Sequence, residues 1–141
     1  MRVCCSILFF LISVILFAQN AFIRTYGMED SFNEGKGIVA FSDSTYILLG
    51  NRQTTGGQSS AWLFRVDSTG TILWEKYFLD CDLSSAENLS RHDDSSVIVT
   101  GTSLAGSDYS AFVARVSLSG NLIWKKTVGP QQWDAGYCSV S

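Results

Sequence analysis

The sequence contains a single histidine, His92, which stands among charged residues: Arg91 precedes it, and Asp93 and Asp94 follow it. A zinc site or an acid–base pair would need further ligands or partners at suitable spacing. The sequence places no second histidine or nearby cysteine where it could serve. The cluster is therefore interpreted as a solvated turn between strands, and no metal, cofactor or catalytic group is predicted.

Carboxylates and a thiol gather where Asp80 and Asp82 flank Cys81. The two acids could supply oxygens to Ca²⁺, but the sequence lacks both EF-hand spacing and glycine–aspartate nonapeptide repeats. We interpret them as solvated loop acids. Cys81 and Cys138 fall in equivalent loops, so in an oxidising compartment they either form a disulfide or remain two unpaired thiols.

Arg65 and Arg115 occupy equivalent positions within apolar stretches. A buried unpaired guanidinium would be costly, so two interpretations arise. In the first, each arginine pairs with a carboxylate or with carbonyls at a strand end, while its stem packs between sheets. In the second, both line a central channel and bind an anionic ligand. Their repetition favours the structural role.

The four tryptophans raise the question of carbohydrate stacking. Trp74 and Trp124 recur in register, and Trp62 is matched by Phe112. This recurrence predicts that these four side chains belong to the core between sheets. Trp133 has no aromatic counterpart and stands in a loop, which makes it the best candidate for contact with an external ligand.

These residues recur because the chain repeats itself. Residues 61–74 (AWLFRVDSTGTILW) return as residues 111–124 (AFVARVSLSGNLIW), at an offset of 50. Upstream, YILLG at 46–50 matches VIVTG at 97–101, and residues 22–27 match residues 124–129. A period of this length is typical of stacked or radial repeat architectures.

Each repeat contains four short segments rich in β-branched and aromatic residues, separated by turn formers. The predicted strands are 36–41, 46–50, 61–66 and 71–77 in the first repeat, and 87–91, 97–102, 111–116 and 121–127 in the second. Within 61–66, both Trp62 and Phe64 on one face and Ala61 and Leu63 on the other are apolar. A sheet with one wet face would alternate cleanly, so these sheets are predicted to be covered on both sides. An all-β fold of β-propeller type meets this constraint, and a β-sandwich is the alternative.

The string AFVARVSLSGNLIWKKTVG, preceded by VIVTG, resembles the bacterial β-propeller repeats of the SBBP type and related repeats of large exported surface proteins. The resemblance covers nearly all of residues 22–141 and implies a propeller fold without indicating a chemistry. The sequence departs from the family pattern at a few positions. Ser60 and Ser110 stand in place of Asp, Arg65 and Arg115 in place of Lys, and Leu79 in place of a glycine between blades.

The N-terminus reads as a secretory signal peptide. Arg2 is followed by the apolar run 3–17 and by the small residue Ala18. Cleavage there predicts a secreted or cell-surface protein with no stable membrane insertion. The formal net charge of −3 and the absence of basic runs argue against nucleic acid or anionic membrane as a partner.

The resulting organisation is a signal peptide at 1–18, the last strand of a partial repeat at 19–26, two blades at 27–78 and 79–128, and the start of a third blade at 129–141. Closed propellers contain about 4–8 blades, so two blades are expected to remain open and to need further blades or self-association. The predicted function is a non-enzymatic exported binding or scaffold module for a protein or carbohydrate ligand. The alternatives are part of a larger propeller-based hydrolase or lyase, and a truncated reading frame without independent function.

Overall fold

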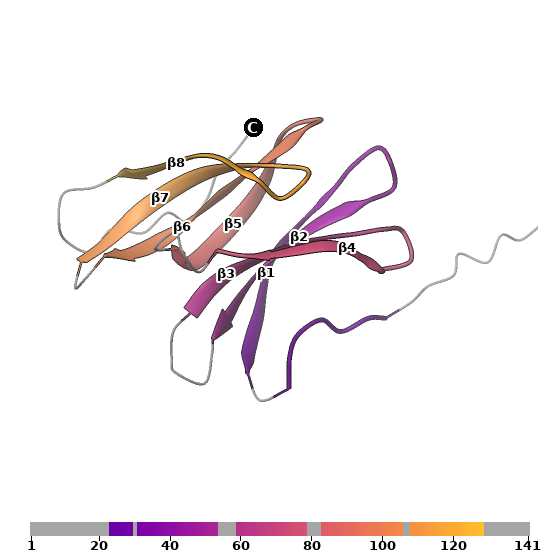
Figure 1. The fold of residues 1–141 in the computed structure, drawn as a ribbon, viewed down its shortest axis with the longest axis horizontal. Coiled ribbons are helices and arrows are strands. Elements are labelled where there is room, and N and C mark those ends of the chain that lie inside the picture. The colour runs from indigo at the N-terminus through magenta and orange to yellow at the C-terminus, as the bar shows by residue number, and fades with distance from the viewer. Residues whose placement is uncertain (1–22, 30, 54–58, 79–82, 106–107, 129–141) are drawn as a thin grey trace, which may run out of the picture.

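The computed structural model describes residues 23–29, 31–53, 59–78, 83–105 and 108–128 (Figure 1). These residues form eight antiparallel strands and, among themselves, no helix; accordingly, they include no helix long and apolar enough to cross a membrane. The strands are β1 (Phe32–Ala40), β2 (Tyr46–Gln53), β3 (Ser59–Val66), β4 (Ile72–Tyr77), β5 (Leu83–Asp93), β6 (Ser96–Ala105), β7 (Asp108–Ser117) and β8 (Leu122–Val128).

The strands make two four-stranded sheets, each of which follows chain order. The first sheet has the order β1-β2-β3-β4 and the second has the order β5-β6-β7-β8. Figure 1 shows the two sheets as separate layers, with no closure into a ring. The prediction of an all-β fold made of two open four-stranded sheets is confirmed, and all eight predicted strands are present.

The tight turns of the two sheets follow from their sequence. Asp67 opens the β3–β4 turn, and its Oδ1 accepts hydrogen bonds from the backbone N–H of Thr69 at 2.8 Å and of Thr71 at 3.0 Å. Gly70 and Gly120 close the equivalent turns with φ of 78°, a conformation that glycine adopts without steric cost. The repeat thus encodes the same hairpin twice.

The main core lies between the two sheets. The first sheet contributes Ile47, Leu49 and Leu63, and the second contributes Val97, Val99, Phe112, Ala114 and Val116 among others. Polar contacts also cross this interface. The buried Asn51 side chain donates to the Ala86 carbonyl and accepts from the Ala86 N–H, both at 2.8 Å. Lys36 joins Glu34 of β1 at 2.9 Å to Glu87 of β5 at 3.0 Å.

Two of the four aromatic residues predicted to lie in this core differ from expectation. Phe112 is fully buried between the sheets, and Trp74 is half-buried at the same interface. Trp62 is buried, but on the opposite face of the first sheet, where it packs with Phe64 and Val66. Trp124 is 37% exposed, so its assignment to the core is wrong.

The exposure of Trp124 follows from the side of the sheet on which it lies. Trp74 pairs with Arg65 and Trp124 pairs with Arg115, so both tryptophans point toward the position that the next sheet along the chain would take. For Trp74 this position is filled by the second sheet. Beyond β8, the described part of the chain contains no further sheet.

Residues 19–26 are expected from the sequence to form the last strand of a partial repeat. Of these, the described residues 23–26 belong to no strand and instead run over the outer face of the first sheet, the face turned away from the second sheet. Tyr26 anchors them there, with its ring 5.0 Å from that of Phe64 and its hydroxyl donating to the Gly70 carbonyl at 2.7 Å.

Candidate functional site

The first candidate residue, Arg65, is held by internal contacts. Its Nη2 lies 2.5 Å from Asp43 Oδ2, and its Nε donates to Thr45 Oγ1 at 3.0 Å. Its Nη1 reaches across to the second sheet, where it donates to the Leu118 carbonyl at 3.4 Å. Trp74 Nε1 donates to the same carbonyl at 2.8 Å. Arg65 and Trp74 together therefore hold the β7–β8 turn against the first sheet.

Arg115 repeats the first part of this arrangement. Its Nη2 lies 2.6 Å from Asp93 Oδ2, and its Nε donates to Ser96 Oγ at 2.9 Å. Hydrogen bonds from the Ser96 hydroxyl, and then from Ser95, hold the pKa of the Asp93 carboxyl well below its ordinary value of 3.8. Both guanidinium groups are thus paired with a carboxylate at a strand end, as the structural interpretation expects.

Sequence reasoning missed the acids of these two clusters. Asp43 and Asp93 are 50 residues apart, like the arginines they pair with, and that shared spacing was the available signal. His92 is exposed, with its Nε2 3.9 Å from Asp93 Oδ2. Within the described ranges, no three His, Cys, Asp or Glu side chains gather as a metal site. Asp80, Cys81, Asp82, Trp133 and Cys138 lie outside those ranges.

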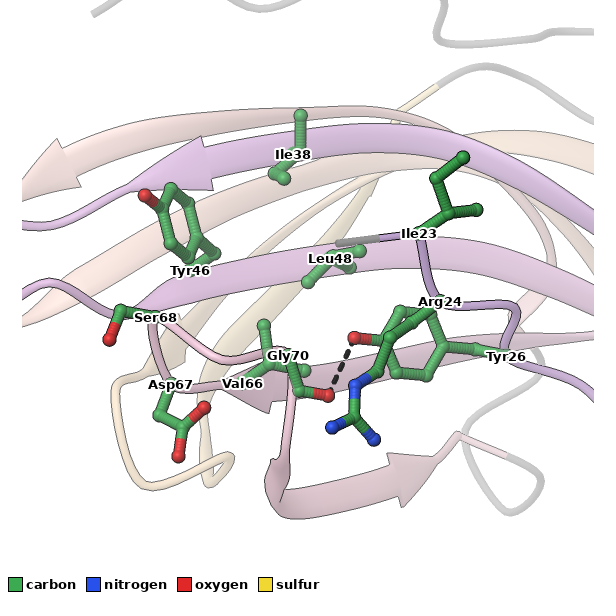
Figure 2. Close-up of a pocket in the computed structure, with 10 residues that line it drawn as sticks. All are labelled: Ile23, Arg24, Tyr26, Ile38, Tyr46, Leu48, Val66, Asp67, Ser68 and Gly70. Carbon is green, nitrogen blue, oxygen red and sulfur yellow. Dashed lines mark hydrogen bonds between the residues drawn. The ribbon is translucent and has the colours of Figure 1, made fainter. Parts of the chain in front are cut away.

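The outer face of the first sheet carries an apolar groove of about 410 Å³. Its lining comes from residues 23–26, from strands β1 to β3 and from the β3–β4 turn, as Figure 2 shows. Ile38, Tyr46, Leu48 and Val66 form the apolar part, and Tyr26 closes one side through its bond to Gly70.

Aromatic rings pack beside this groove, on the same face of the first sheet. Trp62 stacks on Phe64 with 4.3 Å between ring centroids and on Tyr77 with 5.9 Å. Glu75 accepts hydrogen bonds from Trp62 Nε1 and from the Tyr77 hydroxyl, both at 3.1 Å. Because Trp62 is only 6% exposed, this ring stabilises the sheet and presents little surface for stacking a sugar.

The groove corresponds position by position to a surface that is buried elsewhere in the molecule. The repeat and the strand registers equate four residues of its lining with core residues of the second sheet: Ile38 with Leu89, Tyr46 with Val97, Leu48 with Val99, and Val66 with Val116. Leu89 is 7% exposed beneath the first sheet, whereas Ile38 is 63% exposed. Among the residues that the structure describes, the groove is therefore the uncovered counterpart of the interface between the sheets.

Comparison with known proteins leaves the chain unassigned: no protein-family model matches it, and no curated protein matches it significantly.

Proposed function

We propose that the chain is a non-catalytic exported module of β-propeller type that binds a partner protein through the outer faces of its sheets. The topology supports the propeller assignment because each sheet is one consecutive four-stranded meander. In a propeller blade the strands follow in this way, and blades pack face to face around an axis.

The observation that carries the proposal is the uncovered groove on the first sheet. Exposed apolar surface bordered by polar residues is characteristic of interaction sites. Here the border is formed by Arg24, Asp67 and Ser68, and the floor by aliphatic side chains and Tyr46. The equivalent surface of the second sheet is covered by protein, which favours a protein surface as the occupant.

A scaffold role also fits the use that the chain makes of its charged residues. Arg65 and Arg115 are each engaged by an aspartate and a hydroxyl group of their own sheet. These contacts stabilise the turns at the sheet ends. They also favour the groove, over the two arginines, as the binding surface.

The test uses an apolar fluorescent dye, anilinonaphthalene sulfonate, as a defined probe of the groove. Ile38→Asn places an amide in the groove, and Leu73→Asn is the matched control because Leu73 is a 51% exposed residue of the same sheet outside the groove. We expect saturable dye binding that weakens in Ile38→Asn and persists in Leu73→Asn, with similar melting temperatures for both. Equal binding by both variants, or no binding by the parent chain, would contradict the proposal. Saturable binding of an oligosaccharide that Ile38→Asn abolishes would indicate a carbohydrate partner instead.

A further inference from the structure

Strands β7 and β8 carry counterparts of the two residues that join the sheets within the chain. Trp74 and Arg65 bind the Leu118 carbonyl of the second sheet. Trp124 and Arg115 are their counterparts and keep the same cross-strand pairing. Arg115 is partly exposed and Trp124 is 37% exposed, so this second set faces outward.

The turn that Trp124 and Arg115 would bind in a second copy also lies on the surface. The β3–β4 turn at residues 67–70 is the counterpart of the β7–β8 turn at residues 117–120, and Ser68 corresponds to Leu118. Asp67 and Ser68 border the groove on the first sheet. One chain therefore presents both partners of a tryptophan–turn contact that is already seen between its own sheets.

We propose that copies of this chain associate head to tail, with Trp124 on β8 of one copy docked on the β3–β4 turn that borders the groove of the next. The inference rests on the proposed function and names a second copy as the partner. Trp124 of one copy takes the role of Trp74 and donates to the Ser68 carbonyl of its neighbour. This contact repeats the one that Trp74 makes with the β7–β8 turn inside the chain, next to the packing of β1, β2 and β3 against β5.

Charge supports this pairing. Lys126 pairs in register with Val113, so it lies on the same outward face as Trp124. Within the chain, the counterpart Lys76 lies beside Gly120 of the β7–β8 turn, which opens with the uncharged Ser117. Between copies, Lys126 would lie beside a turn that opens with Asp67, which adds attraction between opposite charges.

Residues 23–26 compete with this association. They align with the end of β8 and cover one side of the groove, so a second copy must displace them. Their described attachments are few: Tyr26 bonds to Gly70 and packs on Phe64, whereas Ile23 is 97% exposed. Weakening this anchor should therefore strengthen association.

The two contacting surfaces differ, which makes the association heterologous. Such contacts close into rings when the rotation permits. With about 4–8 sheets in a closed propeller, a ring of this chain would hold about two to four copies.

The experiment is sedimentation velocity of the full chain over a range of concentrations, with the N-terminus of the soluble product read by mass spectrometry. Trp124→Glu blocks the β8 surface, Ile38→Glu blocks the groove, and Leu73→Glu is a matched exposed control outside both. We expect concentration-dependent oligomers for the parent and for Leu73→Glu, and monomers for each blocked variant. An equimolar mixture of the two blocked variants should give a dimer and nothing larger, since each retains the surface that the other has lost.

Two further variants sharpen the result. Lys126→Glu should raise the dissociation constant by about tenfold, while Tyr26→Ala should lower it. A monomeric parent would overturn the inference, and so would a mixture of blocked variants that fails to dimerise. If the parent is monomeric and Trp124→Glu lowers its melting temperature, the surface around Trp124 is covered by another segment of the same chain. Self-association can fail while dye binding still depends on Ile38, in which case the proposed binding module stands with a different partner.

Discussion

The same substitution is expected to have opposite effects at Gly101 and Gly35. A Cβ atom built at Gly101 would lie 2.1 Å from the Ser85 carbonyl oxygen and 2.8 Å from Ala86 Cα. Both atoms belong to the backbone of β5, so relief requires a strand to move rather than a side chain to rotate. A Cβ at Gly35 would meet nothing within 4 Å.

The magnitudes follow from these contacts. Overpacking a core costs about 1–3 kcal/mol, and the backbone clash places Gly101→Ala at the upper end of that range. Alanine also lowers the backbone entropy of the unfolded chain, which stabilises the folded state by about 0.4–1 kcal/mol. The net destabilisation of Gly101→Ala is then about 2 kcal/mol. At Gly35 only the favourable contribution applies, because its φ is not positive. Gly35→Ala should therefore stabilise the chain by about 0.5 kcal/mol.

Urea unfolding followed by tryptophan fluorescence measures both variants against the parent, at a concentration where the chain is monomeric. Thermal unfolding of the same variants should show that Gly101→Ala lowers the melting temperature by about 10 °C, as expected for a domain of this size. Equal midpoints for Gly101→Ala and Gly35→Ala would refute the close approach of β5 and β6 at this position.

Three other predictions concern the core, the acid response and processing. Phe112→Ala should cost about 3–5 kcal/mol of unfolding free energy because the ring is fully buried, whereas Trp124→Ala should cost less than about 1 kcal/mol in the monomer; chemical denaturation compares the two. The pKa of Asp93 is lowered, first by the Ser96 hydroxyl, so its stabilisation is present above the ordinary value of 3.8 and is lost as the pH falls below it. Asp93→Asn should therefore flatten the fall of melting temperature between about pH 5 and about pH 2. If the N-terminal segment is a signal peptide, mass spectrometry of exported material should find the first residue at or next to Gln19, and a product that begins at Met1 would contradict cleavage.

The sequence repeat was sufficient to predict the strands and turns, because those depend on local pattern. Segments rich in β-branched and aromatic residues, separated by turns that close at the glycines 70 and 120, specify hairpins wherever they occur. Burial was less predictable, because it depends on what lies opposite each face. Trp74 and Trp124 are identical in type and register, yet only Trp74 has a described sheet against it.

The candidate site was harder to predict from the sequence than the strands and turns were. Tyr26 belongs to no strand, and its bond to Gly70 joins residues 44 positions apart. The groove is recognised only once Ile38 and Leu48 are found on a face of the first sheet that neither described sheet covers. Equating these residues with Leu89 and Val99 would have shown that the outer face of the first sheet is as apolar as the core. Whether anything covers that face cannot be read from residue types.

The contacts between the sheets have a consequence for the order of folding events. Each sheet consists of neighbouring hairpins, whose pairing closes short loops. The bonds of Asn51 to Ala86, Trp74 to Leu118 and Arg65 to Leu118 span 35, 44 and 53 residues. Local contacts form fast, and distant ones must first overcome the entropy of loop closure. The two meanders should therefore form early and independently, and their docking should be the slow step, completed when the Leu118 carbonyl meets its two donors.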